Sequence, residues 1–232
     1  MTSAHRSARQ ALISTEAFRS NFRQFSEFDC PVDLTGDAFG HGIDHIISLA
    51  QDLGVTEFSV ARERDLARVL NVAPAASVRI LPVDSDRVAL LYGLQPSENR
   101  EIKPVMTLTS EVIAVKPIEA GGGVSYGYTW RAPSDGWLAL CALGYADGFN
   151  RAWGNRIMAH QGNLEFPAVG RVAMDAHSIS TGDSAIDVGS FVFYFGTFAS
   201  RTVFAQDLAE TVGSSPLSVT SGLTRRVARI LV

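Results

Sequence analysis

The hydrophobic pattern of this chain changes in kind shortly before its midpoint. In the first part, apolar residues recur at helical spacing and alternate with short apolar runs of the kind that form buried strands. Phe18, Phe22 and Phe25 recur at i, i+4 and i+7, which predicts one apolar face of a helix. Ser14 or Thr15 can cap this helix. The first part is therefore predicted to contain both helices and strands.

The rest of the first part alternates strand and helix. The predicted strands are 32–37, 57–61 and 78–82, and the predicted helices between them are 43–53 and 62–70. Gly54 ends the earlier helix, because glycine accepts the left-handed conformation found beyond helix ends. This βαβαβ order is typical of a parallel sheet.

The second part is predicted to be a β domain. Its predicted strands are 106–115, 136–143, 155–160, 166–172 and 187–195, followed by a helix at 205–212 and a last strand at 226–232. Turn sequences such as Asp147-Gly148 separate these strands. The polar stretch 95–100 is typical of an exposed connection. We therefore expect one domain at 1–100 and a second at 101–232.

Length limits the architecture further. An eight-stranded (β/α) barrel takes about 250 residues by itself, and this chain has 232. At about 30 residues for each βαβ unit, the part before residue 105 holds roughly three units and not eight. A complete barrel with a second domain is therefore excluded.

Composition excludes several other classes. Twenty basic and 24 acidic residues are scattered along the chain, so we expect no nucleic-acid partner. Cys30 and Cys141 lie outside any C-x-x-C motif and are expected to be small buried hydrophobes. No apolar run approaches the ~20 residues of a membrane span, so we expect a cytoplasmic protein without a membrane partner. The acid-free start, with Arg6 and Arg9, leaves an organelle transit peptide open.

One motif suggests a metal. His41 and His45 lie four residues apart with Asp44 beside the second, which resembles an inverted zinc-protease pattern with Asp in place of Glu. A zinc site needs a third ligand, so we expect an incidental histidine in a loop and no metal. The remaining histidines are interpreted as surface or hydrogen-bonded residues: His5, His160 and His177.

Three motifs of the second part carry a family resemblance. They are Val124-Ser125-Tyr126-Gly127, then Leu143-Gly144-Tyr145-Ala146-Asp147-Gly148 followed by Arg151, then Val169-Gly170-Arg171-Val172-Ala173-Met174-Asp175. In this order and spacing they resemble the C-terminal β domain of the alanine racemases that use pyridoxal phosphate (PLP). Upstream, 37–42 resembles the loop after the family's first barrel strand, and 58–61 resembles its second strand.

The resemblance is interrupted between Val83 and Leu90. The stretch 80–83 resembles the third barrel strand, whereas 91–94 resembles the segment that leaves the last one. The fold class implied is α/β plus all-β: a truncated (β/α) barrel fragment followed by an alanine-racemase-like C-terminal β domain. Such a barrel cannot close within one subunit.

The resemblance implies PLP, but the cofactor positions are degenerate. The family holds PLP as a Schiff base on a lysine, and Thr35 stands at that position. Phe39 stands where a tyrosine hydroxyl is expected. Arg225 lies in the region of the second phosphate contact and can hold a phosphate only by charge. PLP is thus implied by family resemblance only, and covalently bound PLP is not expected.

The substrate side of the family's site is retained. Tyr126 matches the tyrosine that transfers a proton in a partner subunit's site, and Tyr145, Met174 and Asp175 match the entrance and substrate-carboxylate contacts. A free phenol has a pKa of about 10, and the cations that lower it belong to the missing segment. We therefore expect a protein that lacks racemase activity and has an assembly or binding role, as a homodimer or with a related subunit.

Two alternatives stay open. One is an active racemase that interconverts L- and D-alanine, with PLP held noncovalently or on Lys103 or Lys116 and a small amino acid as substrate. The other is an internally deleted or engineered chain that retains the β domain.

Overall fold

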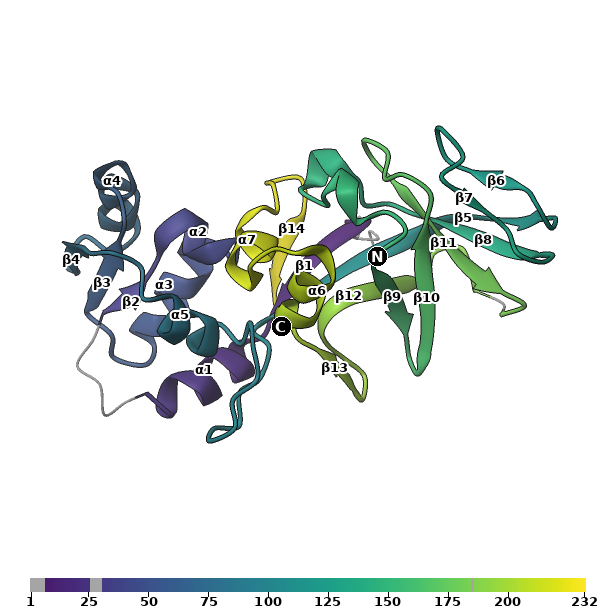
Figure 1. Cartoon of the computed structure of the whole chain (residues 1–232). Helices are drawn as coiled ribbons and strands as arrows, with labels where there is room; N and C mark the ends of the chain where they lie inside the picture. Colours follow the sequence, from purple (N-terminus) through teal and green to yellow (C-terminus); the bar gives the residue numbers. More distant parts are fainter. Residues whose placement is uncertain (1–6, 26–30, 185) are drawn as a thin grey trace, which may run out of the picture.

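The computed structural model describes residues 7–25, 31–184 and 186–232. Two parts lie side by side in Figure 1: a small α/β part on the left and a large, mostly antiparallel sheet on the right. Helices α6 (Ala205–Val212) and α7 (Pro216–Ser221) lie between them. The combination of a truncated barrel fragment with a β domain is as predicted.

The small part is built on a three-stranded parallel sheet in the order β2-β3-β4. Its strands are β2 (Val32–Asp33), β3 (Glu57–Val60) and β4 (Ser77–Ile80). Its helices are α1 (Thr15–Arg23), α2 (Thr35–Phe39), α3 (Ile43–Gln51), α4 (Glu63–Val72) and α5 (Ser85–Leu91). Ser14 caps α1 as predicted, because its side chain accepts the Ala17 N–H at 3.1 Å.

The sheet of the small part is buried at its centre and open at the β4 edge. Phe58 and Val60 of β3 are fully buried, whereas Ile80 is 52% and Leu81 37% exposed. An unpaired strand edge with exposed apolar side chains is a surface to which another chain can add. The described strands of this part therefore form a sheet and not a closed barrel.

The large sheet has the strand order β13-β12-β9-β10-β11-β8-β5-β1-β14, and β12 also pairs with β5. The strands are β1 (Arg9–Ile13), β5 (Met106–Ile118), β8 (Gly136–Cys141), β9 (Met158–Gln161), β10 (Leu164–Val169), β11 (His177–Gly182), β12 (Phe191–Phe198), β13 (Arg201–Val203) and β14 (Ala228–Leu231). The second pairing of β12 curls the sheet back on itself. The short hairpin β6 (Gly123–Val124) and β7 (Trp130–Arg131) forms a sheet of its own, and its Val124 packs against Leu138 and Val169 of the large sheet.

Strand β1 was not predicted from the sequence. It lies between β5 and β14, antiparallel to the first and parallel to the second. The first described strand thus belongs to the sheet of the second part. The domain boundary near residue 100 stays a prediction.

The C-terminal segment joins the two parts. The Arg229 guanidinium donates to the carbonyl of Gly40 at 2.8 Å and to that of Leu223 at 2.9 Å. Gly40 has φ +83°, and a Cβ there would lie 2.1 Å from the Thr220 carbonyl oxygen. Only glycine therefore allows α2 to approach α7 this closely.

The loop after β2 differs from its prediction. The predicted strand 32–37 ends at Asp33, and four consecutive residues, from Gly36 to Phe39, have φ between 50° and 64°. This left-handed turn costs roughly 1–2 kcal/mol for each non-glycine residue, so tertiary contacts must hold it. Alternating hydrophobicity contains no signal for such a turn.

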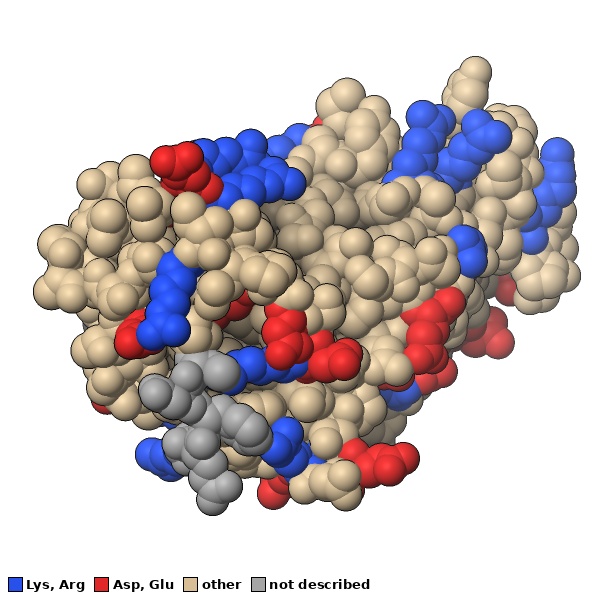
Figure 2. Space-filling view, turned by 60° about the vertical axis from the view of Figure 1, so that its left-hand side comes forward, with Lys and Arg blue, Asp and Glu red and all other residues tan. Residues whose placement is uncertain are grey.

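The predictions drawn from the composition concern the cysteines, the charged residues and membrane spans. Cys141 is buried as predicted, whereas Cys30 lies outside the described residues. Charged side chains of both signs form small separate groups on the face in Figure 2. Among the described residues, helices of the length and apolarity that a membrane crossing demands are absent.

Candidate active site

Tyr126 lies in the turn between β6 and β7. The turn is left-handed on both sides of it, with φ 60° at Ser125 and 83° at Gly127. The Ser125 hydroxyl donates to the Arg171 carbonyl at 2.6 Å, which anchors the turn to the third sequence motif. The Tyr126 side chain is 81% exposed, so this chain presents its phenol outward to solvent.

Tyr145 and Met174 lie on two loops that are paired along their backbones. The Tyr145 N–H donates to the Ala173 carbonyl at 3.0 Å, and the Ala146 N–H donates to the Met174 carbonyl at 2.9 Å. A Cβ at Gly144 would lie 2.3 Å from the Met174 carbonyl oxygen, so glycine is required for this approach. The structure thus brings the second and third motifs together, with both predicted side chains partly exposed.

A cluster of charged side chains holds these two loops in place. The carboxylate of Asp147 is fully buried and accepts the Gly144 N–H at 2.8 Å. Its oxygens lie 3.2 Å from Arg9 Nε and 3.0 Å from Arg226 Nε, and Arg226 also pairs with Asp175. Asp175 is thereby tied to the C-terminal segment. We name Arg9, Asp147, Asp175 and Arg226 the arginine–aspartate cluster.

Sequence reasoning missed this cluster apart from Asp175. The pattern around Asp147 indicates only a turn, and Arg9 lies 138 positions before it. The sequence signal at Asp147 is an acidic residue in the short segment that follows an apolar strand.

A buried polar chain supports the same loops. His177 Nδ1 lies 2.7 Å from the Leu143 carbonyl, so Nδ1 carries the proton and Nε2 accepts from the Tyr194 hydroxyl at 3.1 Å. The Ser110 hydroxyl then donates to Tyr194 at 2.7 Å. Burial lowers the pKa of His177 to about 4, so its imidazole is neutral at pH 7. His177 is hydrogen-bonded, one of the two predicted alternatives.

Thr35 occupies the position of the expected cofactor lysine. Its hydroxyl accepts the Ala61 N–H at 2.9 Å, and its own N–H donates to the Asp33 carboxylate at 2.8 Å. Burial raises the pKa of Asp33. The Thr35 side chain therefore links the ends of β2 and β3 and carries no amine.

The two other expected cofactor positions are Phe39 and Arg225. Phe39 is buried against the ring of Tyr92, with 5.5 Å between centroids, and has no hydroxyl. The Tyr92 hydroxyl donates to the Asp33 carbonyl at 2.6 Å, so this ring covers the end of β2. Arg225 is exposed in the C-terminal segment. Because position 35 carries an alcohol and no amine, it does not fit covalently held PLP.

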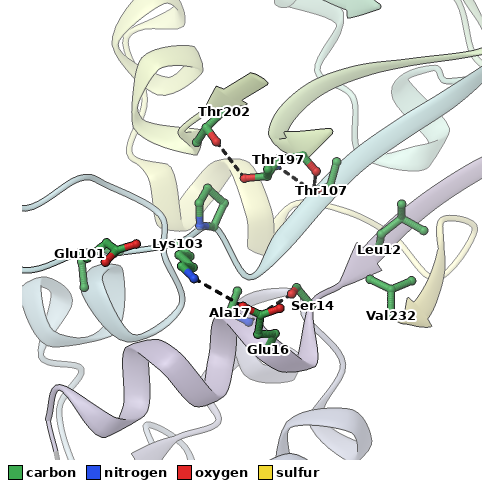
Figure 3. Close-up of a pocket in the computed structure, with 12 residues that line it drawn as sticks. Leu12, Ser14, Glu16, Ala17, Glu101, Lys103, Thr107, Thr197, Thr202 and Val232 are labelled. Carbon is green, nitrogen blue, oxygen red and sulfur yellow. Dashed lines mark hydrogen bonds and ion pairs between the residues drawn. The ribbon is translucent and has the colours of Figure 1, made fainter. Parts of the chain in front are cut away.

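Lys103 lines a different cavity, of about 550 Å³, between α1, the start of β5 and the β12–β13 hairpin (Figure 3). Its Nζ lies 3.4 Å from the Glu16 carboxylate. Its backbone is held by Asn21, which accepts the Lys103 N–H at 2.9 Å. Thr35 and Phe39 do not line this cavity. Lys116 is exposed on β5.

Of the histidine pair, His41 lies between α2 and α3, whereas His45 lies in the first turn of α3. His41 Nδ1 bonds the Ala38 carbonyl at 2.9 Å, and burial lowers the pKa of His41 to about 4. Throughout residues 7–25, 31–184 and 186–232, no three His, Cys, Asp or Glu side chains are grouped so that they could hold a metal.

Known proteins resemble the chain in sequence and in fold. The family described as "Alanine racemase, C-terminal domain" matches residues 105–231, more than half of the chain. An alanine racemase of Mycobacterium ulcerans is 33% identical over 204 residues, which cover 85% of this chain and 50% of the relative. The chain thus spans about half the length of the curated relatives it matches.

Solved structures share the fold. An alanine racemase from Acinetobacter baumannii superposes with a TM-score of 0.84 at 17% identity, covering 98% of this chain and 100% of that one. An alanine racemase from Bartonella henselae with covalently bound pyridoxal phosphate has a TM-score of 0.79 at 15% identity, covering 98% and 100%. With three motifs in the family's order and a matching C-terminal domain, the chain belongs to the alanine racemase family.

Proposed function

We propose that this chain is a member of the alanine racemase family without racemase activity, and that its C-terminal domain acts as a binding module. The observation that carries the proposal is the Thr35 hydroxyl, which is hydrogen-bonded to the Ala61 amide at the position where an amine is required. An imine with an aldehyde forms only on an amine, and an alcohol cannot replace it. Phe39 removes a phosphate contact as well.

The retained motifs form the binding surface in this proposal. Tyr126, Tyr128, Tyr145 and Met174 are 81%, 63%, 40% and 52% exposed. Tyrosine and methionine are enriched at protein interfaces. The arginine–aspartate cluster and the His177 chain hold the last two loops, so little ordering entropy is lost on binding. We name these four residues the tyrosine–methionine face.

The partner we propose for this face is a second copy of the chain. The open β4 edge with exposed Ile80 and Leu81 offers a further contact for association. Binding to a related racemase subunit with a complete barrel is the other outcome of the test. That this chain is cytoplasmic stays a prediction.

Cofactor binding is tested on the purified chain with added PLP. We expect no imine absorbance, no pyridoxyl adduct after borohydride reduction and no D-alanine formed from L-alanine. An adduct together with turnover would refute the proposal and support the active racemase. Loss of the imine band in Lys103→Gln or Lys116→Gln would then identify the lysine.

Association is tested by analytical ultracentrifugation. Tyr126→Ala and Met174→Ala are expected to weaken self-association, or association with a full-length alanine racemase. Leu164→Ala is the matched control, because Leu164 is 46% exposed but lies outside the face. A chain that stays monomeric and binds neither partner contradicts the binding role.

A further inference from the structure

Strand β4 has a neighbouring strand on one side only. It pairs in parallel with β3, and β3 pairs on its other side with β2. Every other described strand belongs to the large sheet or to the β6–β7 hairpin. In Figure 1, β4 lies at the left-hand end of the molecule, away from the large sheet. The described residues thus leave the outer edge of β4 to a strand from another molecule.

The backbone of β4 directs two residues outward. The N–H groups of Ser77 and Leu81 donate, at 2.9 and 3.1 Å, to carbonyl oxygens of the neighbouring segment 56–60. Along a strand, the backbone groups of alternate residues point to opposite sides, and an edge strand therefore has one unpaired row. The N–H and C=O groups of Val78 and Ile80 form this row. A strand that pairs with β4 would satisfy them.

Apolar side chains accompany this free backbone. Ile80 and Leu81 are exposed on β4, and Leu70 and Val72 of the adjoining helix α4 are 38% and 40% exposed. Exposed apolar side chains that gather in one place are typical of an interaction site. The edge of β4 thus combines hydrogen-bonding groups with an apolar surface.

The one charged side chain of β4 is already paired. The Arg79 guanidinium donates to the Glu57 carboxylate of β3 at 2.6 Å. A charged residue on an edge strand ordinarily opposes pairing with another strand. Because Glu57 supplies a counter-ion from the same sheet, Arg79 repels a second arginine less than an unpaired one would.

The unpaired row fits a second copy of β4 in one register. An antiparallel pair with Arg79 opposite Arg79 of the other copy places Val78 opposite Ile80 of that copy on both sides. The outward groups are then all used, in about four hydrogen bonds. A register centred on Ile80 brings Pro82, which has no N–H, opposite Val78. One centred on Val78 brings Ala76, which lies outside the strand, opposite Ile80.

We propose that two copies of this chain pair through β4, antiparallel about a two-fold axis at Arg79, so that their three-stranded sheets join into one. A two-fold contact uses the same edge of both copies and therefore stops at a dimer. The inference rests on the proposed assembly of two copies and adds to it a defined edge and register. It does not require the tyrosine–methionine face.

The expected dimer is reversible. A pairing of four-residue strands buries less than the about 1,200–2,000 Å² of a stable interface, so we expect a Kd on the order of 10 μM. Sedimentation velocity of the full chain between about 1 and 200 μM measures it. A chain that stays monomeric throughout this range overturns the inference.

Cysteine cross-linking measures the register. In the proposed pair the Arg79 Cα atoms are about 4.5 Å apart, which a disulfide can span. Arg79→Cys is therefore expected to give a linked dimer on oxidation. Ser77→Cys is the matched control, because Ser77 is also exposed but would lie roughly 14 Å from its own copy. Both changes are made in a chain with Cys30→Ser, in which the remaining Cys141 is buried. Equal linkage at both positions, or none at position 79, overturns the register.

Ile80→Pro tests the backbone hydrogen bonds. Proline removes an N–H that faces away from β3, a position at which an edge strand tolerates it. We expect association to weaken about tenfold or more, whereas the control Ile80→Val should associate as the wild type does. Association unchanged in Ile80→Pro, with circular dichroism confirming the fold, contradicts the proposed pairing.

Glu57→Gln tests the charge argument. It leaves the two Arg79 side chains without their counter-ions, so we expect the dimer to weaken about two- to fivefold, and more at low salt. Unchanged association at low salt would contradict the facing arginines.

The two proposals fail in different ways. Tyr126→Ala and Met174→Ala, which test the tyrosine–methionine face, are expected to leave the linkage of Arg79→Cys unchanged. If they abolish it, the strand pairing is overturned and the face remains. An adduct with PLP together with turnover would refute the proposed function and leave the linkage as evidence for the β4 pairing.

Discussion

Replacing Asp147 tests whether the arginine–aspartate cluster holds the candidate loops. Its carboxylate is fully buried, whereas the Arg9 side chain is 23% exposed and the Arg226 side chain, at 41%, lies at the surface. Removing one partner of a buried ion pair costs about 3–5 kcal/mol, because the remaining charges lose their counter-ion. Since both arginines retain some contact with water, we expect Asp147→Ala to lie near the lower end, at about 3 kcal/mol.

Asp147→Asn separates charge from hydrogen bonding. The asparagine oxygen can still accept the Gly144 N–H, a bond worth about 0.5–1.5 kcal/mol. We therefore expect Asn to be less destabilising than Ala by about that amount. The neighbouring exposed Arg225→Gln is the control and should leave stability within about 0.5 kcal/mol.

Urea unfolding followed by fluorescence measures these differences, with thermal unfolding as a second readout. A loss of 3 kcal/mol corresponds to a fall in Tm of about 6–12 °C in a chain of this size. An Asp147→Ala variant within about 1 kcal/mol of wild type would refute the argument, because a buried acceptor and two arginine contacts would then contribute almost nothing.

Two further predictions concern backbone fit and pH. Gly40→Ala should lower the free energy of unfolding, measured in urea, by about 2–4 kcal/mol, because its Cβ would lie 2.1 Å from the Thr220 carbonyl oxygen. Gly54→Ala is the control: Gly54 has a similar φ but lies in open space, so its replacement should cost only about 1–2 kcal/mol. Equal losses would show that the α2–α7 contact adapts freely. The folded-state pKa of His177, about 4, lies below its unfolded value of 6.5. Its stabilisation is therefore complete above pH 6.5 and declines as pH falls towards 4, by up to about 1.4 kcal/mol per pH unit. His177→Gln should flatten the stability profile between pH 7 and 4, and an unchanged slope would contradict a neutral buried imidazole.

Much of the secondary structure could be predicted from local pattern. The alternation of strands and helices predicted the parallel sheet of β2, β3 and β4, and local hydrophobic pattern predicted the bounds of α6, because burial of one face is visible within each segment. The left-handed turn before Gly40 was missed, since it is held by contacts with α7 and not by its own composition. Strand β1 was missed for the same reason, as its partners lie about a hundred residues or more along the chain.

The sequence alone determined the family, the motifs with Tyr126, Tyr145 and Met174, and the absence of an amine at Thr35, because side-chain chemistry depends only on residue identity. Only the tertiary structure decided that Arg9 and Arg226 meet Asp147, and that the buried Nδ1 of His160 has no hydrogen-bond partner among the described residues. These contacts join residues that are distant in sequence, or depend on which elements cover a face of the sheet. Burial decides how strongly such polar groups interact and whether an unpaired atom can reach water, and burial results from the packing of the whole chain and not from any short segment.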